Sequence, residues 1–172
     1  MPTRLPYRAA RTNLVLDSLK SLFADLTGGA KPAERFADDD YRVAAAALLV
    51  HAATIDGGMA ESEREKLRSV LQARFDLSDA ATTELIDEAT AAEHEAVDLY
   101  NFTSKLNRAL DDDGRRRVVE MMWEIIYADG RLNEFEDNLV WRAADLLHVS
   151  SRDRIEIRRK VGGERAPLDD DN

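Results

Sequence analysis

Two segments of the chain carry carboxylates at matching positions. Asp56 and Glu63 lie seven residues apart in the first, and Asp129 and Glu136 repeat this pattern 73 residues later. In both segments a glycine directly follows the aspartate, and an apolar residue and a further glutamate precede the final glutamate. If the segments pack together, four carboxylates would repel one another unless a cation lay between them. Hard oxygen ligands select Ca²⁺, Mg²⁺ or Mn²⁺, so the pattern predicts a candidate divalent-cation site.

The same residues also fit the rules of helix capping. Each Asp-Gly can end one helix, because glycine readily takes the left-handed conformation. Asn133 suits the N-cap of the next helix, with Glu136 as its partner three residues later. In the first segment Ala60 holds the cap position and is a poor cap, yet Glu63 is retained. Capping therefore explains Glu136 better than Glu63. The spacing is not that of an EF-hand, which needs alternate Asp or Asn ligands and a glutamate at position twelve.

The chain offers little for conventional catalysis. It has no cysteine and only three histidines, His51, His94 and His148, none with a partner at motif spacing. His51 and Glu124 occupy equivalent positions, five residues before each aspartate. A nitrogen ligand there would favour a transition metal, but a histidine on an apolar helix is more often a hydrogen-bonded core residue. No nucleophile, oxyanion donor or phosphate loop is recognisable, so we expect a protein that is not an enzyme. A carboxylate- or metal-based hydrolase is the least favoured alternative.

Helical periodicity dominates the sequence that must position these side chains. Residues 41–55 are apolar nearly all round, which is typical of a buried central helix. Amphipathic helices are predicted over residues 61–75, 79–96, 98–110, 112–128, 133–147 and 151–160. In the segment 133–147 the residues expected to face inward are Phe135, Leu139, Ala143 and Leu147. The prediction is an all-α, single-domain bundle of about seven to eight helices, with two pseudo-repeated helical hairpins.

The two ends of the chain have a different character. Residues 1–37 combine a flexible stretch with an amphipathic helix over 14–26 and a linker, and residues 162–172 are predicted to be a disordered acidic tail. The helical domain then spans residues 38–161. The segment 14–26 could pack on the bundle, or it could dock on a partner or peripherally on a membrane surface.

Charge and composition exclude several classes of function. The net charge of -10 and a pI near 4.8 argue against nucleic-acid binding. The run Asp111-Asp112-Asp113-Gly114-Arg115-Arg116-Arg117 is better interpreted as acidic residues at a helix start, paired along the helix with the arginines. No segment reaches the ~20 apolar residues that a membrane span needs, and the N-terminus does not resemble a secretory signal. A chain without cysteine fits a cytoplasmic location.

With both Asp-Gly…Glu motifs in this helical context, the chain resembles the tellurite-resistance TerB family. The likeness runs from Asp40 to about Val149, and related domains occur in some J-domain co-chaperones. The resemblance implies an all-helical fold of two similar halves, with Asp56, Glu63, Asp129 and Glu136 as proposed metal-binding residues. It also implies a role in tellurite resistance, stress or phage and colicin defence, beside partner proteins at the inner membrane. This chain departs from the family in its added N-terminal amphipathic helix.

Two functions from different classes therefore remain open. The first is a divalent-cation-binding module, using Ca²⁺, Mg²⁺ or Mn²⁺, that acts through protein partners in a stress pathway. The second is a metal-free protein–protein adaptor in which the acidic turns only cap helices. The sequence does not decide the oligomeric state.

Overall fold

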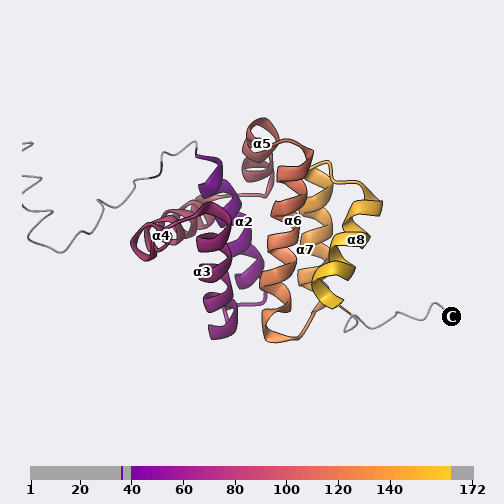
Figure 1. Ribbon diagram of the computed structural model, residues 1–172, viewed down its shortest axis with the longest axis horizontal. Coiled ribbons are helices and arrows are strands. Elements are labelled where there is room, and N and C mark those ends of the chain that lie inside the picture. The colour runs from indigo at the N-terminus through magenta and orange to yellow at the C-terminus, as the bar shows by residue number, and fades with distance from the viewer. Residues whose placement is uncertain (1–35, 37–39, 164–172) are drawn as a thin grey trace, which may run out of the picture. The chain divides into compact units, whose positions relative to one another are not determined.

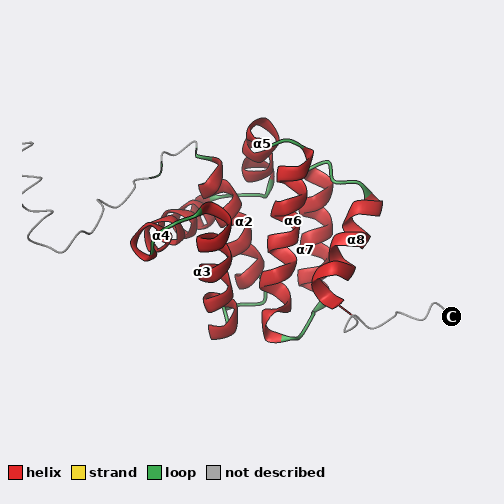
Figure 2. Ribbon diagram, in the orientation of Figure 1, coloured by secondary structure: helices red, strands yellow, loops and turns green. Residues whose placement is uncertain are grey.

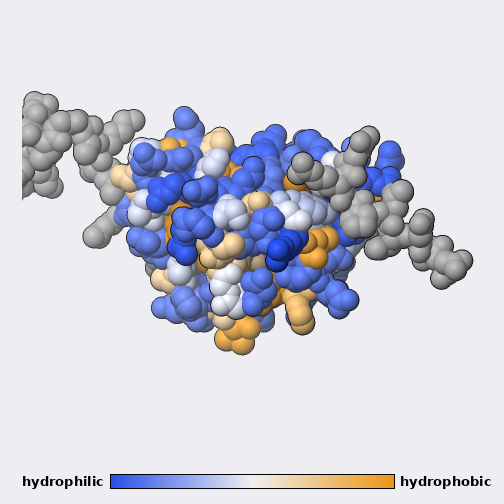
Figure 3. Space-filling model, turned by 90° about the horizontal axis from the view of Figure 1, so that it is seen from below, coloured by the Kyte–Doolittle hydropathy of each residue, from blue (hydrophilic) through white to orange (hydrophobic). Residues whose placement is uncertain are grey.

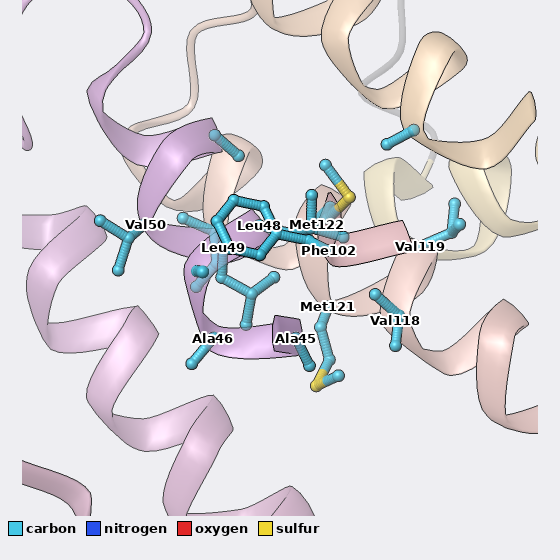
Figure 4. Packing of buried hydrophobic residues seen from close by; sticks show 14 of the residues in the cluster. Ala45, Ala46, Leu48, Leu49, Val50, Phe102, Val118, Val119, Met121 and Met122 are labelled. Atoms are coloured by element: carbon cyan, nitrogen blue, oxygen red, sulfur yellow. The ribbon is translucent and has the colours of Figure 1, made fainter. Parts of the chain in front are cut away.

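The central element is helix α2, Tyr41–Thr54, which is apolar on nearly all sides. Asp40 begins it as the N-cap, accepting a hydrogen bond from the backbone N–H of Arg42 at 2.9 Å. Every residue from Val43 to Val50 is buried, and so are Ala52 and Ala53. Its alanines let neighbouring helices approach closely, and α2 contacts α3, α4, α5, α6 and α7. Figure 4 shows the meeting of α2 with Phe102 and with the side chains of α6.

The computed structural model describes residue 36 and residues 40–163. Over this range the chain is helical throughout, with turns but no strand (Figure 2). The remaining elements are α3 Glu61–Phe75, α4 Asp79–Glu95, α5 Tyr100–Ala109, α6 Asp112–Ile126, the 3₁₀ turn η1 Tyr127–Asp129, α7 Glu134–Leu146 and α8 Ser151–Gly162. The all-α prediction is confirmed. The predicted helix over residues 14–26 and the predicted tail beyond residue 163 lie outside the described residues.

The repeat is larger than the predicted hairpins. Helices α3 and α7 begin at Glu61 and Glu134, which keep the spacing of 73 residues. A third helix follows in each half, and it packs on the first helix of its own half: α4 on α2, and α8 on α6. Helix α5 connects the two three-helix units. The two halves therefore present their acidic turns in equivalent places.

The predicted details that differ from the structure include helix ends and one inward-facing residue. Helix α8 continues to Gly162, two residues beyond its predicted end. The prediction that Phe135 faces inward is wrong, because its side chain is 70% exposed. The buried face of α7 begins instead at Glu136 and continues through Leu139, Val140 and Ala143. A carboxylate thus takes the inward position in the first turn of this helix.

The acidic and basic run at the start of α6 behaves as a helix start. Asp111 is the N-cap and accepts a hydrogen bond from the backbone N–H of Gly114 at 2.8 Å. Arg115 pairs with Asp112, and Arg116 pairs with Asp113 at 3.4 Å, each over three residues of the helix. In the part of the chain that the structure describes, no helix is both long and apolar enough to cross a membrane.

Candidate functional site

Each Asp-Gly pair forms the tight turn that ends the first helix of its half. Gly57 has a φ of 110° and donates its backbone N–H to the carbonyl oxygen of Thr54 at 3.0 Å. Gly130 has a φ of 74° and donates in the same way to Tyr127 at 3.1 Å. Side chains other than glycine rarely adopt these angles, so the turn chemistry predicted from the sequence is present in both copies.

The two glutamates cap the helices that follow. The carboxylate of Glu63 accepts the backbone N–H of Ala60 at 2.7 Å, and that of Glu136 accepts the backbone N–H of Asn133 at 2.9 Å. In the second copy the amide oxygen of Asn133 also accepts the N–H of Glu136 at 2.9 Å, which completes a reciprocal capping box. Ala60 has no side-chain oxygen, so the first copy has only the glutamate half of this arrangement. The predicted asymmetry between the copies is confirmed.

Both capping glutamates are buried, which capping does not require. Glu63 is 3% exposed and Glu136 is 2% exposed. Glu63 continues the buried stripe of α3 that includes Leu67, Val70 and Leu71, just as Glu136 continues that of α7. Burying a carboxylate is costly unless its charge is compensated. These two positions are therefore unusual in both halves of the repeat.

The four predicted residues are electrostatically coupled. Burial raises the pKa of Glu63, and the nearby charges of Asp129 and Asp56 raise it further, against the lowering effect of its hydrogen bond from Ala60. Burial also raises the pKa of Glu136, and Asp129, Asp56 and Glu63 all add to this effect, against the lowering effect of its hydrogen bond from Asn133. Such coupling across both halves means that the two acidic turns lie near one another.

The helix packing explains this proximity. The turn η1, which contains Asp129, contacts α3, the helix that carries Glu63. Both turns lie at the same end of the bundle, at the bottom of Figure 1. Figure 3 looks onto this end, whose surface is mostly hydrophilic with separate apolar side chains. The repeat thus brings Asp56, Glu63, Asp129 and Glu136 to one end of the molecule, which we call the acidic end.

The side chains at the acidic end are not drawn together around one point. Asp56 and Asp129 are exposed, and Asp129 accepts the backbone N–H of Arg131 at 2.8 Å. Among the described residues, no group of three or more His, Asp or Glu side chains is arranged so that it could hold a metal ion. All four side chains carry carboxylate oxygens, with two glutamates buried and two aspartates on exposed turns.

The residues upstream of the turns serve other contacts. His51 Nδ1 lies 2.8 Å from the carboxylate of Glu93 on α4. Glu124 pairs with Arg74 at 2.8 Å and with Lys66 at 3.8 Å. The hydrogen bond expected for His51 is present, but its side chain is 34% exposed and is not a core residue. Neither side chain joins the acidic end.

Sequence reasoning did not find the surface features beside the acidic end. An open cleft of about 740 Å³ lies between α3, α6 and α8, and its walls carry both charges, with Lys160 2.8 Å from Glu120. A second cleft of about 380 Å³ is lined by His51, Glu93, the fully exposed Val97 and the exposed Phe135. The spacing of residues in the sequence does not predict such clefts. The one available signal is that Phe135 directly precedes Glu136, whose side chain points inward.

The fold and the site together define an all-helical domain of two repeats that meet at paired acidic turns. The family model described as tellurite resistance protein TerB matches residues 42–159. That span covers more than half of the chain, and the chain therefore belongs to the TerB family. No match was found among the curated proteins or among the solved structures.

Proposed function

We propose that this protein is a binding module that takes up a divalent cation at its acidic end, through Asp56, Glu63, Asp129 and Glu136. The observation that carries the proposal is the burial of two glutamates with raised pKa values, one from each half, beside two further acids. Without a cation this cluster opposes its own ionisation. A bound cation would remove the repulsion and stabilise the charged forms.

The chemistry of the cluster favours Ca²⁺, Mg²⁺ or Mn²⁺. Glu63 and Glu136 each use Oε2 to accept a cap N–H, which leaves Oε1 of each carboxylate for a cation. Asp56 and Asp129 are on exposed turns, where a side-chain rotation costs little, and water could complete the ligand shell. The cation would neutralise the charge and join the two halves, and this role needs no catalytic group.

The proposed role is therefore one of binding and signalling through a protein partner, in keeping with a family that is associated with tellurite resistance. We propose a cytoplasmic location, which the absence of cysteine supports. Within this proposal the cation would set the shape and charge of the acidic end that a partner meets.

Isothermal titration with Ca²⁺, Mg²⁺, Mn²⁺ and Zn²⁺ tests the cation site. The test variant is Glu63→Gln/Glu136→Gln, which keeps an oxygen for each cap N–H but cannot carry charge. The matched control is Glu61→Gln/Glu134→Gln, which changes the exposed first-turn acids at equivalent positions. We expect wild type and control to bind one of the hard cations and the test variant to bind at least about tenfold more weakly. Absence of binding by wild type, or equal binding by the test variant, would refute the site.

Tryptophan fluorescence offers a second readout of the same titration. Trp123 is buried in α6, and its ring stacks on that of Tyr127 in η1, with 5.4 Å between the ring centroids. Tyr127 is two residues from Asp129, so an ordering of this turn by a cation should change the emission of Trp123. The test variant should show no such change.

A metal-free adaptor is the second candidate. Both glutamates accept hydrogen bonds from the N–H groups of the residues that begin their helices. Helix capping alone could therefore explain why a glutamate occurs at each position. The cleft beside Phe135 and Val97 exposes apolar surface that a protein partner could cover. Titrations without binding for any of the four cations would favour this candidate, and the predicted docking of residues 14–26 on a partner or membrane would then be the next feature to test.

A further inference from the structure

Helices α4 and α8 occupy equivalent places in the two halves but carry opposite charge. Helix α4 has six acidic residues and neither lysine nor arginine, whereas α8 has five basic and two acidic residues. The two helices lie on opposite flanks of the bundle, α4 on the left and α8 on the right of Figure 1. Helix α4 packs on α2 and α3, while α8 packs on α6. The described part of the molecule is therefore charged oppositely at its two flanks.

One face of α4 combines two carboxylates with two alanines. Glu88 and Glu95 are exposed, with Ala91 and Ala92 between them on the same side of the helix. All four line an open groove of about 510 Å³ that α4 forms with the start of α2 and with α5. Neither glutamate makes an ion pair with another described residue. Lys105 of α5 is the one basic residue that lines this groove.

The outer face of α8 has the complementary pattern. Arg152 and Arg159 are exposed and form no ion pair within residues 40–163. Ile155 lies between them on the same face, and its side chain is 43% exposed. Glu156 is the one exposed acid beside it. This face thus presents Ile155, with Glu156 beside it, between two guanidinium groups.

The two patterns have the same length. Glu88 and Glu95 are seven residues apart, as are Arg152 and Arg159. Seven residues span about 10 Å along a helix and return to nearly the same face. An α8 laid along the groove can therefore pair both arginines with both glutamates while Ile155 rests on the alanines. Within one molecule the two helices are on opposite flanks, so the pairing requires two molecules.

We propose that this protein associates head to tail, with the face Arg152–Ile155–Arg159 of one copy in the α4 groove of the next. Because the two surfaces differ, the contact is heterologous and repeats from copy to copy, giving short chains or a closed ring. Exposed ion pairs and one isoleucine make a weak contact, so the association is concentration-dependent and is weakened by salt. The surfaces are separate from the acidic end, and the proposal stands without a bound cation.

Charge exchange tests this contact in the full-length protein. Glu88→Lys/Glu95→Lys makes both proposed contact faces basic, and Arg152→Glu/Arg159→Glu makes both acidic. The average sedimentation coefficient of wild type should rise with protein concentration. Sedimentation velocity from about 10 µM to about 1 mM protein, at about 0.02 M salt, measures this rise. Each variant alone should weaken the association at least about tenfold, because like charges now face each other. A mixture of the two variants should restore it, since each contact between one variant and the other again joins opposite charges.

A cysteine pair gives an independent test, because the native chain has no cysteine. Under mild oxidation Ala91→Cys alone and Ile155→Cys alone should not cross-link, whereas a mixture of the two should give a dimer. The variant that carries both changes should give a ladder of oligomers or a closed ring. Circular dichroism on every variant checks that the helices are retained. Wild type that stays monomeric throughout, mixed variants that fail to associate, or single-cysteine variants that cross-link to themselves would each overturn the proposal.

Discussion

Replacing both buried glutamates with glutamine should abolish the effect of divalent cations on stability. The variant Glu63→Gln/Glu136→Gln keeps the side-chain oxygens that accept the N–H groups of Ala60 and Asn133. It removes two carboxylates whose charged forms are disfavoured by burial and by their acidic neighbours. In the presence of a chelator at pH 7 we therefore expect this variant to unfold at a higher temperature than wild type.

The magnitudes of the related changes follow from the same contacts. Alanine at either position loses the cap hydrogen bond, so it should be less stable than glutamine by about 1 kcal/mol. For a folded unit of this size that corresponds to about 4 °C in Tm. A cation present at about one hundred times its Kd should stabilise wild type by about 2.7 kcal/mol and leave the glutamine variant unchanged. The order of stability should thus invert when the cation is added.

Differential scanning calorimetry over a range of pH checks the reasoning. Because the folded-state pKa values of Glu63 and Glu136 are raised above the ordinary value of 4.5, the folded state holds these protons more tightly than the unfolded state does. Their contribution is fully present below that ordinary value and is lost as the pH rises through the raised folded-state pKa values. Wild type in chelator should therefore lose stability over this range relative to the glutamine variant. A glutamine variant that is less stable than wild type at pH 7 in chelator would refute the account.

Three further predictions concern stability, measured by urea unfolding. Gly130→Ala should lower the free energy of unfolding by about 1 kcal/mol, because φ is 74° at this position. Gly58→Ala, which has open space around its Cβ position, should stay within about 0.5 kcal/mol of wild type. Equal effects of the two substitutions would contradict this prediction. Leu49→Ala should lower the free energy of unfolding by about 2–5 kcal/mol, because the Leu49 side chain is fully buried. A decrease below about 1 kcal/mol would show that the core relaxes to fill the space left by the missing side chain. Phe135→Ser should change stability by less than about 0.5 kcal/mol, and a larger loss would mean that this exposed ring packs after all.

Local sequence rules predicted most of the fold. The all-round apolar character of residues 41–55 indicated a buried helix, and α2 is buried from Val43 to Val50. Asn133, predicted as an N-cap, takes that role in α7, and Asp111 begins α6 within the acidic run expected at a helix start. A cap depends on residues within one turn of a helix, so helix starts can be predicted without knowledge of the tertiary structure.

The acidic end was predictable as a set of residues but not as a geometry. Duplication at a constant spacing marked Asp56, Glu63, Asp129 and Glu136 together, and a repeat that folds alike in both halves brings its turns to one end. Which way each side chain points depends on how α3 and α7 are rotated about their axes. Phe135 and Glu136 both lie at helical spacing from Leu139, and hydrophobicity favoured Phe135, which is exposed. Only the packing of the other helices selects Glu136.

The position of α2 has a consequence for how the protein is made. This helix leaves the ribosome before every other helix in the described range, yet it is apolar on nearly all sides and is covered partly by α6 and α7 of the second half. Until α6 and α7 are synthesised, some 70 or more residues later, the Ala- and Leu-rich surface of α2 is only partly buried. The nascent first half is thus an aggregation-prone intermediate, and its early association with a chaperone would protect it.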